Sequence, residues 1–248
     1  MSERTAPVPA ADRSSSYREA YARLVAAQKT AARGAPAYSR FVNRRLGRFL
    51  AAWAYSRGLT PNQVTGLSAL ATFTGIALLA LLPQTWWLGV VVAGALVLGY
   101  ALDSADGQVA RLSGTSSQAG EWLDHVVDAT KVVTLPLALL VGLYRFDAVD
   151  DGWLAIPLLH AVVGTVLFFA MILTEQMRRA RGTTSVAEPG QAGRLRALLL
   201  VPTDYGVLCL SFLLLGLPVA FLVVYGALVL ATTLFVLAAL VKWFRELS

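Results

Sequence analysis

Four aspartates, Asp103, Asp106, Asp124 and Asp128, lie close together within the stretch LDSADGQVARLSGTSSQAGEWLDHVVD. The segments around them are apolar, and a carboxylate in hydrocarbon is costly unless something compensates its charge. Four carboxylates together also repel one another. A bound cation is the usual compensation, and sites built from oxygen ligands favour hard cations such as Mg²⁺, Mn²⁺ or Ca²⁺. This stretch is therefore predicted to be the chemical centre of the chain.

The spacing of the aspartates predicts how helices would present them. Asp103 and Asp106 are three residues apart, and Asp124 and Asp128 are four apart, so each pair lies on one helix face. The intervening residues 112–119 form a short polar turn, which makes the two helices antiparallel neighbours. All four carboxylates are then expected to converge on one point.

Three residues beside the aspartates suit a phosphate ligand. Gly107 and Gly120 lack side chains and leave room for a bulky polar group, while Arg111 offers a guanidinium fork that matches phosphate oxygens. Metal ligands, space and an anion binder together favour a diphosphate that is held through metal ions.

Two other interpretations compete with metal-phosphate chemistry. In the first, the carboxylates pair with Arg111 and Lys131 for folding alone, although two cations cannot neutralise four acids. Acidic pairs within a membrane also serve ion pathways, so a cation-coupled transporter is the alternative from another functional class.

The composition places the chain in a membrane. Of its 248 residues, 56% are hydrophobic and 15% are charged, and its mean hydropathy is +0.61. These values predict an all-α polytopic membrane protein and exclude an ordinary soluble domain. The single cysteine, Cys209, excludes a disulfide framework or a cysteine metal site within one chain. The first sixteen residues lack an apolar core, so they do not resemble a signal peptide.

The N-terminal third divides into three predicted parts. Residues 1–16 are polar and expected to be disordered, and residues 17–33 have helical periodicity. Residues 38–57 interleave arginines with large apolar residues, which predicts a basic amphipathic helix along an anionic membrane surface. The alternative is a soluble helix that packs on the rest of the protein. We accordingly divide the chain into an extension at 1–37, partly disordered, and a membrane domain at 38–248.

Six transmembrane helices are expected from the length of the apolar segments. Their predicted ranges are 63–82, 86–111, 120–144, 153–178, 201–216 and 218–243. The last two are separated only by Gly216-Leu217-Pro218. A single re-entrant element is the alternative there, but the total apolar length favours two spans.

The distribution of basic residues predicts the topology. The N-terminal region, the loop at 178–196 and the C-terminus carry most of the arginines and lysines, whereas the opposite loops are short and nearly uncharged or acidic. By the positive-inside rule, both termini and the aspartate cluster face the cytoplasm.

The cluster resembles the signature of a known family. It reads D-x-x-D-G-x-x-A-R-x8-G-x-x-x-D-x-x-x-D without a departure, and its fixed positions are Asp103, Asp106, Gly107, Ala110, Arg111, Gly120, Asp124 and Asp128. This pattern is similar to that of the CDP-alcohol phosphotransferase (CDP-alcohol phosphatidyltransferase) family. The likeness includes Thr60-Pro61-Asn62 before the first span and covers roughly residues 38–243.

The resemblance implies an activity in phospholipid biosynthesis. A hydroxyl of an alcohol would attack a CDP-linked donor such as CDP-diacylglycerol, and CMP would leave. By this likeness, two Mg²⁺ or Mn²⁺ ions would be bound by Asp103, Asp106, Asp124 and Asp128, with Asp128 also the general base. Gly107, Ala110 and Gly120 would shape the cytidine pocket, with Arg111 and Asn62 near the phosphates. A non-catalytic relative is a further alternative, which the intact motif argues against.

The resemblance and the composition also suggest partners and a location. A homodimer in a lipid bilayer is expected, with no nucleic-acid partner. The many arginines and alanines are typical of a high-GC bacterial genome, so the expected location is the bacterial plasma membrane.

The acceptor must be selected by residues outside the motif. Lys131 is one turn beyond Asp128 and is expected either to face the cavity or to form a salt bridge with Asp128 or Asp124. Arg178, Arg194 and Arg196 would bind a phosphorylated acceptor such as inositol phosphate or glycerol phosphate. The alternative for these arginines is a basic loop that only sets the topology. The sequence leaves the identity of the acceptor open.

Three further polar residues are assigned to structural roles. His125 is expected to pack beside the site without ligating a metal, and His160 to contact another helix. Asp204 is expected at a helix N-terminus, with acceptor contact as the alternative.

Overall fold

The computed structural model describes residues 16–27, 36–182 and 200–248, and within these ranges the regular elements are helices, with no strand. Among these described residues, five helices are long and apolar enough to cross a membrane. They are α3 (Pro61–Leu81), α4 (Trp86–Ser113), α5 (Gln118–Arg145), α6 (Ala155–Ala180, preceded by the turn η2 at Asp151–Leu154) and α9 (Pro218–Leu247). The predicted all-α polytopic membrane fold is confirmed.

Side-chain caps fix where the first three long helices begin. Thr60 accepts a hydrogen bond from the backbone N–H of Gln63, whose side chain accepts one from the N–H of Thr60, a capping box with Pro61 in the first turn. Thr85 and Ser117 cap α4 and α5 in the same manner with their hydroxyls. The connections between α3, α4, α5 and α6 are short, so each of these helices runs antiparallel to the one before it.

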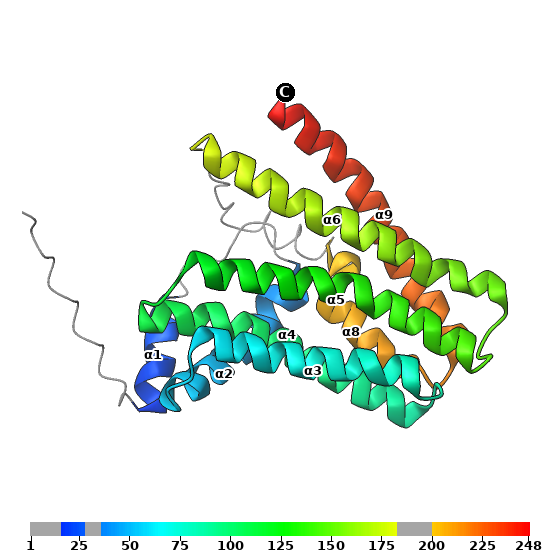
Figure 1. Ribbon diagram of the computed structural model, residues 1–248, viewed down its shortest axis with the longest axis horizontal. Helices are drawn as coiled ribbons and strands as arrows, with labels where there is room; N and C mark the ends of the chain where they lie inside the picture. Colours follow the sequence, from blue (N-terminus) through cyan, green and yellow to red (C-terminus); the bar gives the residue numbers. More distant parts are fainter. Residues whose placement is uncertain (1–15, 28–35, 183–199) are drawn as a thin grey trace, which may run out of the picture.

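The long helices form a bundle in which α6 and α9 diverge from α3, α4 and α5 toward their C-terminal ends (Figure 1). Figure 1 shows α3, α4 and α5 side by side, with α6 along α5 and α9 crossing α6. The α3–α4 contact is close because Gly99 has no side chain: a Cβ there would collide with Thr72. At this crossing the Ser68 hydroxyl donates to the Gly99 carbonyl over 2.8 Å.

The segment predicted as a span at 201–216 is shorter than expected. It consists of the turn η3 (Val201–Thr203), α8 (Tyr205–Ser211) and the turn η4 (Phe212–Leu214). The apolar helix Tyr205–Leu214 is only about 15 Å long, half of a hydrocarbon core. The helix expected at 201–216 is therefore interrupted: α8 begins after Asp204, the residue expected at a helix N-terminus, and its α-helical geometry ends at Ser211.

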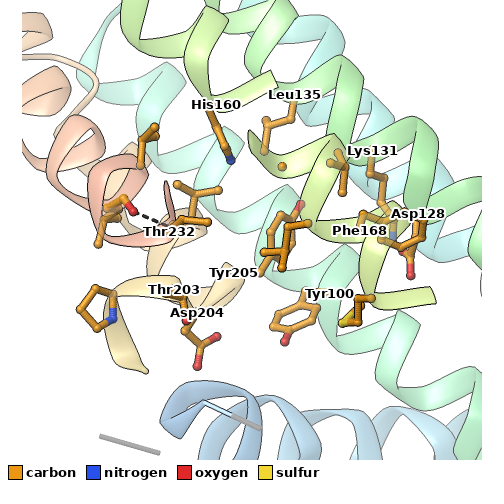
Figure 2. Close-up of a pocket in the computed structure, with 18 of the residues that line it drawn as sticks. Tyr100, Asp128, Lys131, Leu135, His160, Phe168, Thr203, Asp204, Tyr205 and Thr232 are labelled. Carbon is orange, nitrogen blue, oxygen red and sulfur yellow. Dashed lines mark hydrogen bonds and ion pairs between the residues drawn. The ribbon is translucent and has the colours of Figure 1, made fainter. Parts of the chain in front are cut away.

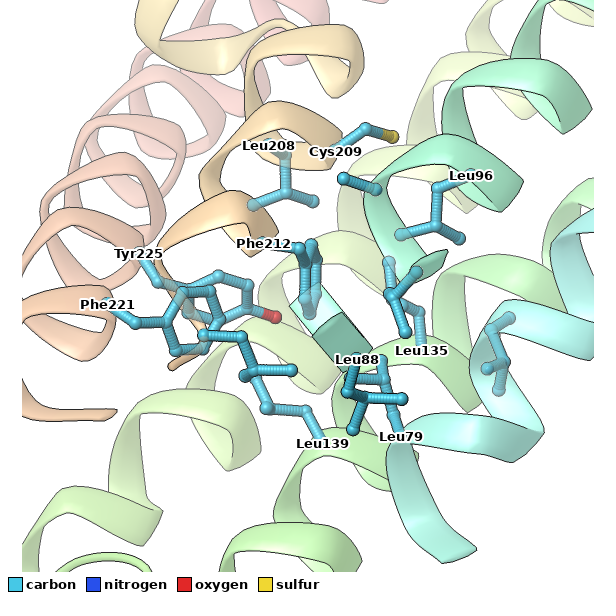
Figure 3. Packing of buried hydrophobic residues seen from close by; sticks show 14 of the residues in the cluster. Leu79, Leu88, Leu96, Leu135, Leu139, Leu208, Cys209, Phe212, Phe221 and Tyr225 are labelled. Carbon is cyan, nitrogen blue, oxygen red and sulfur yellow. The ribbon is translucent and has the colours of Figure 1, made fainter. Parts of the chain in front are cut away.

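The short helix α8 is held inside the bundle by a buried cluster. Figure 3 shows Phe212, Phe221 and Tyr225 packed against leucines of α3, α4 and α5. The ring centroids of Phe212 and Phe221 are 5.2 Å apart, and those of Phe221 and Tyr225 are 5.3 Å apart. In lipid, such close packing is a main source of helix association.

The N-terminal helices lie against the bundle. They are α1 (Tyr17–Ala27), the turn η1 (Ser39–Asn43) and α2 (Arg44–Ser56). An alanine face of α2, Ala51 and Ala52 among it, is buried with residues of α1 and α4, while the large side chains Phe49 and Trp53 stay exposed. Thus α2 packs on the protein and leaves large apolar side chains exposed on its other face.

Part of the predicted extension is also packed. The Arg23 guanidinium of α1 donates to the carbonyl of Leu112 at the end of α4, over 3.2 Å. The helix predicted at 17–33 is described as far as Ala27, and its remaining residues lie outside the described part. The disorder predicted for residues 1–16 falls on residues that, except for Ser16, also lie outside it.

Candidate active site

The turn between α4 and α5 brings the four aspartates together. Gly114 ends α4 with a φ of 65°, a left-handed conformation that glycine adopts without strain. Three residues later the Ser117 hydroxyl accepts from the Gly120 N–H and starts α5. The two helices therefore form an antiparallel hairpin, as predicted, with two aspartates on each arm.

Lys131 joins the two arms. Its Nζ lies 2.7 Å from Oδ1 of Asp103 on α4 and 2.5 Å from Oδ1 of Asp128 on α5, and Lys131 itself is buried. Both expectations for this residue hold in part, because Lys131 lines a cavity and forms salt bridges. Its partners are Asp128 and Asp103, and Asp124 is not among them.

The other two aspartates are bound differently. Asp106 is buried, and its Oδ2 accepts a hydrogen bond of 2.7 Å from the Thr65 hydroxyl of α3, while its Oδ1 accepts from the Gly107 N–H. Oδ1 of Asp124 is shielded from solvent and has no hydrogen-bond partner among the described residues. A buried acceptor without a donor is costly.

These groups fit a divalent cation. One ligand atom each of Asp124, His125 and Asp128 lies within 4.8 Å of the other two, and Asp124 is the residue with the orphaned oxygen. Carboxylate oxygens are ligands that Mg²⁺ and Mn²⁺ accept. His125 also lies 3.8 Å from Glu121 and contacts the Phe168 ring, which agrees with the packing role expected for it.

The four aspartates, which lie within electrostatic reach of one another, line two hollows. Asp106 and Asp124 line a polar pocket of about 530 Å³ between the start of α3 and the α4–α5 hairpin. Asp103 and Asp128 line a second, mostly apolar cavity of about 330 Å³ among α4, α5, α6, α8 and α9. The ion pairs of Lys131 hold Asp103 and Asp128 on the side of the apolar cavity.

The polar pocket contains every residue that the sequence assigned to CDP binding. These residues are Asn62, Gly107, Ala110, Arg111 and Gly120. A Cβ on Gly120 would come within 3.2 Å of both Asn62 Oδ1 and Ser117 Oγ, so Gly120 lets α5 begin close to α3. A Cβ on Gly107 would meet nothing within 4 Å, so the space beside it belongs to the pocket itself.

Positive charge gathers near this pocket. Burial, together with the like charges of Arg111 and Arg40, lowers the pKa of the Arg44 guanidinium on α2. Guanidinium groups that repel one another are stabilised by a nearby anion. The polar pocket is therefore suited to an anionic ligand.

Figure 2 shows the apolar cavity. Asp128 and Lys131 lie at one side and His160 toward the other, with Leu135 between Lys131 and His160 and with Tyr205 near the middle. His160 contacts another helix as predicted, because its Nδ1 lies 2.5 Å from the Tyr225 hydroxyl of α9. Asp204 caps α8 by accepting from the Gly206 N–H, which confirms its predicted place at a helix N-terminus.

Of the three arginines proposed to bind the acceptor, Arg178 is the one that lies within the described residues. Arg178 forms two hydrogen bonds of 2.7 Å with the Glu246 carboxylate near the end of α9, and it lines neither hollow. Arg194 and Arg196 lie outside the described residues.

Two residues of the site were missed by sequence reasoning. Thr65 holds Asp106, and its place three residues after Asn62, on the same helix face, was a usable signal. Tyr205 projects into the apolar cavity from a helix far away in sequence, and no local pattern indicates it.

The comparisons with known proteins agree with the motif. No curated protein matched the chain in a direct sequence search. The sequence model of one family, described as CDP-alcohol phosphatidyltransferase, matches residues 58–236, which include α3 to α6, α8 and most of α9. Because this match spans more than half of the sequence, the chain belongs to the CDP-alcohol phosphatidyltransferase family.

Proposed function

We propose that the protein transfers a substituted phosphate group from a CDP-linked donor, such as CDP-diacylglycerol, to the hydroxyl of an alcohol and releases CMP. The main observation in support of this proposal is the α4–α5 hairpin, whose four aspartates line a polar pocket and an apolar cavity. Family membership supports this reaction class over the alternative of cation-coupled transport.

The polar pocket is the proposed site of the CDP group. Asn62 and Arg111 line it and supply donors for phosphate oxygens, and the open space at Gly107 admits a nucleotide. The basic side chains nearby, including Arg44, favour a ligand with the charge of a diphosphate.

Asp103, Asp106, Asp124 and Asp128 are the proposed ligands of two divalent ions, Mg²⁺ or Mn²⁺. Bound ions would neutralise the negative charge that the diphosphate carries and that grows as CMP leaves. Thr65 keeps the Asp106 carboxylate in place, and Lys131 does the same for Asp103 and Asp128. Asp128 is the proposed general base, and its oxygen that does not contact Lys131 would take the proton of the acceptor hydroxyl.

The proposed setting is the cytoplasmic side of a bacterial plasma membrane, where a homodimer would act in phospholipid biosynthesis. The positive-inside rule supports this orientation. The N-termini of α3 and α5 and the C-terminus of α4 form the site, so it lies at the end of the bundle that carries the basic N-terminal helices.

A direct test measures CMP release. Purified protein in lipid nanodiscs is incubated with a CDP-linked donor, Mg²⁺ or Mn²⁺ and a panel of alcohols, with and without EDTA. We expect CMP only with divalent ions, and a loss of at least about 100-fold in Asp124→Asn. Asp150→Asn, an exposed acid at the opposite end of α5, is the control and should behave as wild type. No CMP from any donor and alcohol would refute the proposal.

A further inference from the structure

The apolar cavity is long and changes character along its length. Its α6 wall is a stripe from His160 to Met171, which covers about 16 Å at the helical rise of 1.5 Å per residue. At one end lie the charged groups of Asp103, Asp128 and Lys131. Beyond them most of the wall is apolar, with Leu135, Leu167, Leu208, Leu228 and Val229 among it, and the carboxylate of Asp204, which also lines the cavity, accepts from the N–H groups of Ser39 and Gly206.

The polar groups toward the far end are already paired. The Nδ1 atom of His160 contacts the Tyr225 hydroxyl, and the Thr232 hydroxyl donates to the carbonyl of Leu228 over 2.9 Å. A polar ligand would gain little there and would lose its hydration, whereas an alkyl chain loses nothing. Cavities of this size and lining are typical sites for largely apolar ligands.

One buried polar group in the cavity has no adequate partner. The Tyr205 hydroxyl is shielded from solvent and makes no hydrogen bond to the described residues; its polar neighbour is the Cys209 thiol, a weak partner. Figure 2 shows its ring near the middle of the cavity, between Tyr100 and Leu135. A ligand oxygen placed here would satisfy this donor.

The position of the apolar cavity relative to the polar pocket indicates which of the two substrates the apolar cavity binds. In phosphoryl transfer the attacking oxygen and the leaving oxygen lie roughly in line with the phosphorus between them. If CMP leaves from the polar pocket beside Asp106 and Asp124, the attacking hydroxyl comes from the other side of the aspartates. That side is the apolar cavity, and the proposed base Asp128 lines it.

We propose that the apolar cavity binds the acceptor, and that this acceptor is a membrane-dissolved alcohol with an alkyl or isoprenoid body. The inference rests on the proposed function. The acceptor hydroxyl gives its proton to Asp128, its oxygen forms a bond to the β-phosphorus of the donor, and the bond from this phosphorus to the CMP oxygen breaks. CMP leaves with the bonding electron pair, and Tyr205 donates a hydrogen bond to an oxygen of the acceptor.

The same apolar chemistry could come from the acyl chains of a lipid donor, so the assay separates the two sources. One arm combines a water-soluble donor, CDP-choline, with dioctanoylglycerol as the apolar alcohol. The other arm combines CDP-diacylglycerol with dioctanoylglycerol, or with the polar alcohols glycerol, inositol or glycerol phosphate. CMP release is measured in each arm while donor and acceptor concentrations are varied.

Two variants report on the cavity. Thr232→Phe fills it, and Thr233→Phe is the matched control, because Thr233 also donates to the carbonyl four residues before it but does not line the cavity. Tyr205→Phe removes only the hydroxyl. Thermal unfolding and CMP binding, which uses the polar pocket, check that each variant is folded.

We expect CMP release to require the apolar alcohol. Thr232→Phe should raise the KM for this alcohol at least about tenfold, and Tyr205→Phe about fivefold, the equivalent of one hydrogen bond. The KM for the donor should stay unchanged in both variants.

Two results would overturn the inference and leave the proposed function standing. One is CMP release with polar alcohols alone that is insensitive to Thr232→Phe. The other is a higher KM for CDP-diacylglycerol in Thr232→Phe when the acceptor is polar, which would assign the cavity to the donor. The absence of CMP from every pair would instead refute the proposed function, and the acceptor role with it.

Discussion

Lys131 of α5 and Asp103 of α4 form an ion pair between neighbouring helices, and Lys131 Nζ lies 2.7 Å from Asp103 Oδ1. The same ammonium group contacts Asp128, so one cation holds two of the four carboxylates. In the absence of this cation the carboxylates would repel one another in a partly buried place.

Replacing Lys131 should therefore make folding depend more on divalent ions. We expect Lys131→Met to lower the free energy of unfolding by about 2 kcal/mol in EDTA. This loss is smaller than the usual cost of breaking a fully buried ion pair, because the two carboxylates are partly exposed. Added Mg²⁺ should restore part of this loss. Thermal unfolding in detergent with a Mg²⁺ titration measures both effects, and Lys242→Met, at an exposed lysine of α9, is the control. Equal Mg²⁺ responses in the two variants would contradict this role.

Gly107 should be required by the ligand and not by the fold. A methyl group there meets no protein atom within 4 Å, so Gly107→Ala should fold at least as well as wild type, since alanine favours a helix by about 1 kcal/mol. The methyl would enter the polar pocket and raise the donor KM about tenfold, the equivalent of about 1.4 kcal/mol.

Gly66→Ala is the matched control for Gly107→Ala. Gly66 is also within a helix, and a Cβ there also meets nothing within 4 Å, but it does not line the polar pocket. If both variants raised the donor KM equally, the effect would not come from the pocket.

The hairpin and the spans were predictable because local rules govern them. The three- and four-residue spacings placed each aspartate pair on one helix face, and the polar stretch at 112–119 indicated the turn. The gathering of Asn62, Gly107, Arg111 and Gly120 in one pocket also followed from the family resemblance.

The division of the site into two hollows could not be predicted. It depends on where the ammonium of Lys131 settles among four carboxylates, and on walls contributed by α6, α8 and α9 from distant parts of the chain. The packing of the short helix α8 had a similar cause, because Phe212, which follows it, contacts Phe221 and Tyr225 from a distant part of the chain.

Thr65 should support metal binding through Asp106. Thr65→Val keeps the shape of the side chain and removes the hydrogen bond to Oδ2 of Asp106. Groups that orient metal ligands are worth tenfold or more in metal affinity, so the Mg²⁺ concentration for half-maximal CMP release should rise about tenfold. Thr74→Val, on the same helix with its hydroxyl bonded to the carbonyl of Leu70, is the control and should leave the Mg²⁺ dependence unchanged.

Arg178 should stabilise the end of α9 without affecting the acceptor. Its guanidinium holds the Glu246 carboxylate through two hydrogen bonds of 2.7 Å. Because the pair is exposed, Arg178→Glu and Glu246→Arg should each cost about 1 kcal/mol, and the double exchange should recover most of it. If Arg178→Glu changed the KM for the acceptor and the double exchange did not reverse this change, Arg178 would contribute to acceptor binding.

Asp128 should be needed for turnover and not for binding of the CDP donor. In Asp128→Asn the amide oxygen can still accept from Lys131, so the ion-paired arrangement of the hairpin is largely kept. The amide cannot take the proton of the acceptor hydroxyl, and the rate of CMP release should fall by about 10²- to 10⁴-fold while the donor dissociation constant changes less than about threefold. Single-turnover CMP release and equilibrium donor binding measure the two quantities, with the exposed Asp151→Asn as control. Near wild-type turnover in Asp128→Asn would mean that another group, or water, removes the proton.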